Sequence, residues 1–203
     1  MPNTLQRAAA VAGQLIMIAV GAYLGLQAEQ WREDRQQARR SERSLRTFRE
    51  EIAGNRARFA EVLPYHRTIA DSLRAGFERT LTDRRPLPIM RLVKETTYNG
   101  TQTVDPQATA YDLAVATQAL GELPPALSYQ LSRVYNRQRA LAAYQDQFTQ
   151  ALMATAPAPR DDASRMLFML DQAMHEIARQ EERLVVAYDS VLPRLDSALA
   201  PRR

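Results

Sequence analysis

Residues 127–152 read LSYQLSRVYNRQRALAAYQDQFTQAL. Large apolar side chains recur in this stretch at intervals of three, four or seven residues: Leu127, Leu131, Val134, Leu141, Phe148 and Leu152. This spacing places them on one face of an α-helix and predicts a long helix that is buried along that face. Gln138 and Gln145 occupy the remaining positions of the seam. They either fix the register of the neighbouring helices or lie at a wet edge.

Similar apolar stripes run from Leu45 to Leu81 and from Met166 to Leu195. The chain has 203 residues, of which only seven are glycine and 7% are aromatic, and strong helix formers dominate it. Such a composition favours helix over sheet, and the length suits one folded unit. The prediction is an all-α protein in which residues 45–200 form an antiparallel bundle of four helical segments.

Prolines and glycines indicate where the helices begin and end. Pro64 and Pro193 are expected to bend or interrupt their helices. Asp105-Pro106 is expected to start a helix that Gly121 ends, and Pro124-Pro125 to start the next. Residues 156–160, APAPR, suggest a turn before a start at Asp161-Asp162, and residues 96–104 suggest either a small hairpin at Asn99-Gly100 or, as we prefer, an irregular loop.

The N-terminal region is apolar and free of charge from residue 8 to residue 28. A stretch of about 20 such residues can cross the ~30 Å hydrocarbon layer, so we predict a short tail (1–7) and a single transmembrane helix (8–28). A buried core helix or a signal peptide cleaved near Ala22 are the alternatives. This hypothesis places the protein in the cell membrane with the lipid bilayer as a partner. The arginines after residue 28 favour a cytoplasmic C-terminal domain, but a signal anchor would leave it outside.

Residues 29–44 contain no large aliphatic side chain and predict a polar helical stalk. Trp31, Arg32 and Arg35 are the expected interfacial anchors at its start. Gly13, Gly21 and Gly25 share one helix face, which permits close approach of a second helix and suggests a homo-oligomer.

The sequence carries no recognisable catalytic or cofactor motif. It lacks cysteine, so disulfides and thiolate chemistry are excluded. His66 and His175 have no partner at metal-ligand spacing, which favours surface or satisfied core roles over a metal site. The net charge of +4 argues against a dedicated nucleic-acid binder. We therefore expect no enzyme activity, no cofactor, no metal and no nucleic-acid partner.

Two stretches resemble a family of uncharacterised bacterial single-pass membrane proteins, the DUF6090-type family. They are residues 18–35, IAVGAYLGLQAEQWREDR, and residues 110–135, AYDLAVATQALGELPPALSYQLSRVY. The resemblance covers about a quarter of the chain. It implies a membrane-attached helical domain and carries over neither an activity nor binding residues.

The favoured functional hypothesis is a membrane-anchored interaction or scaffold protein that binds itself or an unknown protein partner. The alternative is an extracytoplasmic sensor that binds a small ligand near Tyr111, Tyr129, Tyr135 and Tyr144 and acts through a partner. A weaker third class is a catalytic bundle that uses His175 and neighbouring carboxylates.

Overall fold

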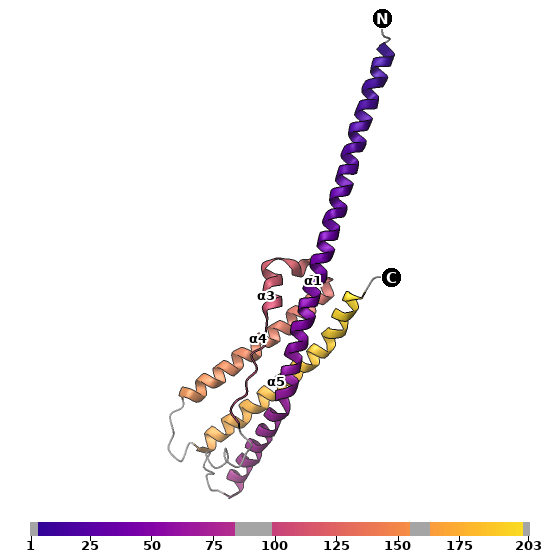
Figure 1. Cartoon of the computed structure of the whole chain (residues 1–203). Coiled ribbons are helices and arrows are strands. Elements are labelled where there is room, and N and C mark those ends of the chain that lie inside the picture. Colours follow the sequence, from indigo (N-terminus) through magenta and orange to yellow (C-terminus); the bar gives the residue numbers. More distant parts are fainter. Residues whose placement is uncertain (1–3, 84–98, 155–162, 201–203) are drawn as a thin grey trace. The chain divides into compact units, whose positions relative to one another are not determined.

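A computed structural model describes residues 4–83, 99–154 and 163–200 of the chain. Its elements are α1 (Thr4–Asp83), α3 (Thr109–Ala116), the 3₁₀ helix η1 (Ala119–Glu122), α4 (Pro125–Ala154) and α5 (Ala163–Leu199) (Figure 1). These ranges contain no strand, so the all-α prediction is confirmed. Residues 99–104 form no hairpin arm, and the expected turn at 156–160 and helix start at 161–162 lie outside the described residues.

The chain divides into two compact units, residues 1–43 and residues 44–203. The first unit consists of the N-terminal part of α1. The second contains the rest of α1 together with α3, η1, α4 and α5.

The predicted transmembrane helix is not supported. Over the part of the chain that the structure describes, no helix has the length and apolar character needed to cross a membrane. The prediction of a single-pass membrane protein anchored by residues 8–28 is therefore wrong, and the interfacial role of Trp31, Arg32 and Arg35 loses its basis. Twelve of the 21 residues in this stretch are alanine, glycine or glutamine, each of which brings less apolar surface than a leucine or isoleucine.

The C-terminal unit is built on three long helical segments, from α1, α4 and α5. Ion pairs at the α1–α5 contact join Arg49 to Asp196 and Arg74 to Asp171, so the numbering of the two helices runs in opposite directions. α4 and α5 pack extensively against each other (Figure 1). A bundle is thus confirmed, and the four expected helical segments correspond to the four α-helices of the described residues, of which α3 is short.

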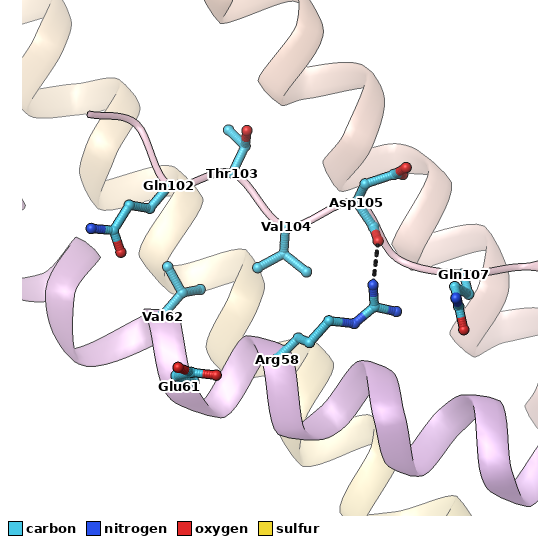
Figure 2. A pocket seen from close by; sticks show the side chains of 8 residues that line it. All are labelled: Arg58, Glu61, Val62, Gln102, Thr103, Val104, Asp105 and Gln107. Atoms are coloured by element: carbon cyan, nitrogen blue, oxygen red, sulfur yellow. Dashed lines mark hydrogen bonds between the residues drawn. The ribbon is translucent and has the colours of Figure 1, made fainter. Parts of the chain in front are cut away.

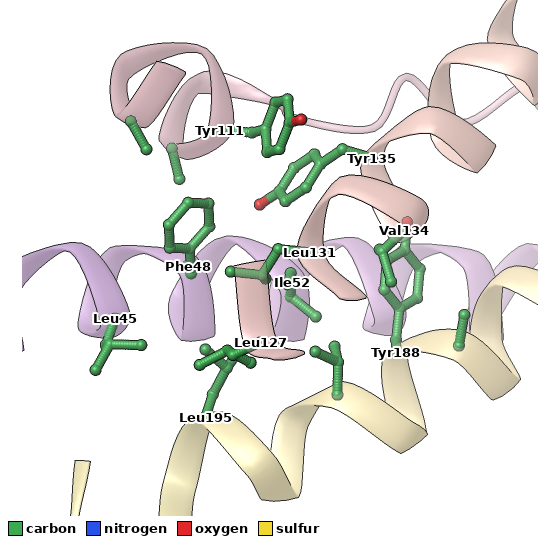
Figure 3. Close-up of a cluster of buried hydrophobic side chains, with 14 of the residues drawn as sticks. Leu45, Phe48, Ile52, Tyr111, Leu127, Leu131, Val134, Tyr135, Tyr188 and Leu195 are labelled. Atoms are coloured by element: carbon green, nitrogen blue, oxygen red, sulfur yellow. The ribbon is translucent and has the colours of Figure 1, made fainter. Parts of the chain in front are cut away.

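Two apolar clusters fill this bundle. The larger is formed around Phe48, Leu131 and Tyr188, all fully buried, and includes α3 and η1 (Figure 3). The smaller is formed by Ile69, Ala70, Leu73, Leu167, Met174 and Ile177. Both clusters draw on the apolar stripes of the sequence, so those stripes do mark the buried faces.

Neither proline ends its helix. α1 continues through Pro64 and α5 through Pro193. Both prolines are exposed, so water can hydrate the carbonyl group that loses its intrahelical donor. The expected interruption at these positions is therefore wrong.

The connection from α1 to α3 differs most from expectation. Residues 99–108, here called the strap, are not helical, and α3 begins at Thr109 rather than at Asp105-Pro106. α3 ends at Ala116, before Gly121, and the left-handed conformation after it is taken by Gln118 (φ 59°). The start of α4 at Pro125 is confirmed.

Candidate functional site

A buried polar layer separates the two apolar clusters. His66 of α1 and Glu181 of α5 are buried polar residues that lie between the two sets of apolar residues on their helices, and the buried Gln145 of α4 follows Tyr144 of the smaller cluster, near the same boundary in the sequence. Buried polar groups cost free energy unless they are hydrogen-bonded. The contacts of this layer therefore decide whether it stabilises or strains the bundle.

The His66 side chain lies between two acceptors. Its Nδ1 is 2.8 Å from Oε2 of Glu181, and its Nε2 is 2.8 Å from the carbonyl oxygen of Thr101 in the strap. The side chains of His66 and Glu181 are 1% and 0% exposed. Burial alone lowers the pKa of His66, but the hydrogen bond to Glu181, the charge of that carboxylate and the Thr101 carbonyl together raise the pKa above its ordinary value. The satisfied core role expected for His66 matches this geometry.

Other α1 side chains bind the backbone of the strap. Asn55 donates from Nδ2 to the carbonyl oxygen of Gln107 (2.7 Å) and accepts at Oδ1 from the Gln107 N–H (2.9 Å). Tyr65 donates to the Gly100 carbonyl (2.6 Å) and accepts from the Asn99 N–H (2.8 Å). These side chains supply the partners that a neighbouring strand or helical turn would otherwise provide.

A shallow pocket of about 480 Å³ lies between α1 and the strap. Figure 2 shows Arg58 reaching from α1 to the strap, where its Nη1 donates to the Asp105 carbonyl oxygen (3.1 Å). Val62 and Val104 add apolar surface. The strap thus forms one wall of the pocket, whose size falls in the range of small-molecule sites.

A second network connects α1 with α3 and α4. Glu51 accepts from the Tyr135 hydroxyl (2.7 Å) and from the Ala110 N–H at the start of α3 (2.9 Å). Burial, then the hydrogen bond to this carboxylate, raises the pKa of Tyr135 far above its ordinary value. Glu51 therefore positions α3 against the bundle.

The buried glutamines of α4 are not at a wet edge. Gln138 donates from Nε2 to the Gln107 carbonyl oxygen (3.1 Å), so it also holds the strap. Gln145 Nε2 and Glu181 Oε1 are a buried donor and a buried acceptor, both without a hydrogen-bond partner in the described part of the chain. They complement each other chemically and are the two unsatisfied groups of the polar layer.

The predicted tyrosine site does not assemble. Tyr111 and Tyr135 stack at 4.7 Å between ring centroids inside the larger cluster (Figure 3). Tyr129 is exposed, and Tyr144 packs on the smaller cluster.

His175 lies among charged side chains. A pocket of about 390 Å³ lies here, lined by Arg67, Arg74, His175 and Arg179 among others. Each of these arginines pairs with a carboxylate of α5, and His175 Nδ1 lies 3.0 Å from the Asp171 carboxylate. Within the described ranges no group of three or more His, Asp or Glu side chains could hold a metal ion.

The helix-pairing candidates lie in the N-terminal unit. No atom comes within 4 Å of the position that a Cβ would take at Gly21 or Gly25, and the surroundings of Gly13 are outside the described residues. Trp31 is exposed, with the guanidinium of Arg35 3.7 Å from its ring centroid, and Arg32 is exposed. Pairing through these glycines remains a prediction.

Sequence reasoning did not find Asn55, Glu51 or the strap. An asparagine and a glutamate on the buried face of a predicted helix are the only signal for them, and that signal does not identify a partner more than 50 residues away. A scan against protein-family models and searches of curated proteins and of solved structures each give no match to this chain.

Proposed function

We propose that this chain is a helical interaction protein and that the N-terminal part of α1 binds a helix of a second copy of the same chain. The observation that carries this proposal is the exposure of that helix. Every described side chain from residue 20 to residue 40 is exposed, and Val20, Leu24 and Trp31 are among them.

An isolated helix with exposed large apolar side chains is costly in water. Most helical stability in proteins comes from packing an apolar face rather than from propensity. Leu24 and Trp31 are 60% and 59% exposed, so their burial by a partner would remove a substantial apolar area from water.

Four of the exposed large apolar side chains, Met17, Val20, Leu24 and Trp31, lie at heptad spacing, whereas Tyr23 and Leu26 lie off this face. Positions spaced by three and four residues form a seam: Met17, Val20, Leu24, Gln27, Trp31, Asp34, Ala38 and Ser41. The seam covers more than three heptads, which is sufficient for a short coiled coil. Continued along the sequence, the same spacing reaches Leu45 and Phe48, which are buried in the C-terminal unit.

The nearly balanced charge of this helix favours a second copy of the chain as its binding partner. Residues 14–43 contain five arginines and four carboxylates, so two copies meet little net repulsion. Asp34 is the single charged residue of the seam, and most residues flanking the seam are neutral. The glycine face is a different face of the helix, and glycines bring little apolar surface for an interface formed in water.

Matched variants of the full chain test this proposal by sedimentation equilibrium. Leu24→Glu places a charge in the seam, whereas Leu26→Glu places the same charge on an exposed leucine away from it. Removing two Leu24 side chains from a dimer interface costs about 3–6 kcal/mol, so the dimer should weaken by roughly 100-fold or more. Leu26→Glu should dimerise as the wild type does.

The variant Gly25→Ala distinguishes dimerisation through the seam from dimerisation through the glycine face. The added methyl group meets open space and favours helix formation, so a seam dimer should be as strong or stronger. A weaker Gly25→Ala dimer would instead support the glycine face. A wild-type chain that stays monomeric, or equal weakening by both glutamate variants, would refute the proposal.

A further inference from the structure

We propose that His66 is a proton-operated latch, which holds the strap at Thr101 while its imidazole ring is protonated and releases Thr101 when the ring loses that proton. This inference is independent of the proposed self-association and concerns the C-terminal unit.

Both contacts of His66 form together when the ring is doubly protonated and Glu181 is a carboxylate. Both nitrogens of His66 lie at 2.8 Å from oxygen atoms that only accept hydrogen bonds, Oε2 of the Glu181 carboxylate and the carbonyl of Thr101. A neutral imidazole carries one N–H and one lone pair. After deprotonation one of the two contacts would set a lone pair against a lone pair, so one contact must break.

The contact to the strap is the weaker of the two. A hydrogen bond to a buried carboxylate is stronger than one to a neutral carbonyl. Glu181 is fully buried and its other oxygen has no partner among the described residues, whereas Thr101 is half-buried and its carbonyl can be hydrated once it moves. The neutral ring therefore keeps its proton on Nδ1 and loses Thr101.

The backbone around Thr101 is suited to local movement. Gly100 (φ 79°) and Gln102 (φ 44°) flank it in the left-handed region. The contacts of Asn55 with Gln107 and of Tyr65 with Asn99 and Gly100 do not depend on the histidine proton, so the strap stays attached on both sides of Thr101. Movement of Thr101 would shift the neighbouring Gln102, which forms part of the wall of the pocket beside α1.

The charged surroundings of the latch are simple. α5 contributes Glu181, the polar layer includes the neutral Gln145 of α4, and the strap contributes only its backbone. On α1 the Tyr65 ring lies 5.6 Å from the imidazole between centroids, and Arg67 pairs with Glu182. Because Glu181 raises the pKa of His66, the latch is closed below the ordinary histidine value near 6.5 and opens as the pH rises through the higher folded value.

The absence of cysteine allows a direct test on the full chain. In a His175→Gln background His66 is the only histidine, so NMR of its ring protons reports its titration. A nitroxide on Thr103→Cys, an exposed strap position, reports strap mobility by EPR from about pH 5 to about pH 9. We expect mobility to rise with the same midpoint as the His66 titration.

Three variants make the result decisive. Glu181→Gln should move both midpoints to lower pH, and His66→Gln should abolish the pH dependence of strap mobility. Tyr65→Phe removes a different strap contact, so it should raise mobility at low pH without moving the midpoint. His66 titration without a change in mobility, or a pH-dependent mobility that persists in His66→Gln, would overturn the latch.

Discussion

Asn55→Ala should weaken the attachment of the C-terminal part of the strap. The Asn55 side chain is fully buried and makes three hydrogen bonds, two with the backbone of Gln107 and one with Nη2 of Arg58 (2.5 Å). At about 1 kcal/mol for each neutral bond and about 1.5 kcal/mol for the charged one, the loss approaches 3–4 kcal/mol. Exposure of Gln107 lets water recover part of this, so we expect a loss of roughly 2–3 kcal/mol.

Urea unfolding followed by far-UV circular dichroism measures this change. The midpoint should fall while the slope stays constant, because the variant unfolds to the same extended chain. Asn136→Ala is the matched control, since Asn136 lies on the exposed face of α4, and its effect should stay within about 0.5 kcal/mol. Equal effects of the two substitutions would refute the assignment of Asn55 as the anchor of the strap.

Three further predictions concern the core, alkaline pH and the seam. Leu131→Ala should lower the free energy of unfolding by about 2–5 kcal/mol because Leu131 is fully buried, and exposed Val186→Ala should change it little in the same denaturation assay. Burial raises the pKa values of Tyr135 and Tyr188, so both should stay protonated until alkaline unfolding. The stability that they contribute to the folded state is complete below the ordinary tyrosine pKa near 10 and is lost as the pH rises further. Tyrosinate absorbance should therefore rise in a late step that coincides with the loss of helix. Asp34→Leu should strengthen self-association, so the fluorescence of Trp31, the only tryptophan, should shift to shorter wavelength at a lower protein concentration than in the wild type. An unchanged association constant would contradict the seam register.

Much of the helical core followed from the sequence. The stripes that begin at Leu45 and Leu127 do face the interior. Apolar side chains spaced three or four residues apart lie on one face of an α-helix, and that face is the one buried in the core. Pro125 starts α4 as expected. The apolar stretch 8–28 was interpreted as a membrane span, whereas no helix of the described residues has the length and apolar character to cross a membrane.

The candidate site could not be predicted in the same way. Asp105-Pro106 has the local chemistry of a helix start, yet the Asp105 carbonyl binds Arg58 and the backbone of Gln107 binds Asn55. Such bonds join residues about 50 positions apart and override local propensity. The sequence likewise contains no sign that His66 would meet Glu181.

The sequence by itself determined that this is a helical protein and which faces of its long helices are buried, because apolar periodicity and propensity act within a few residues. Tertiary structure alone decided that residues 105–108 belong to the strap rather than to a helix. It also decided that a buried histidine joins this strap to α5, because a polar group in the interior is satisfied by whichever partner the packing brings within hydrogen-bonding distance.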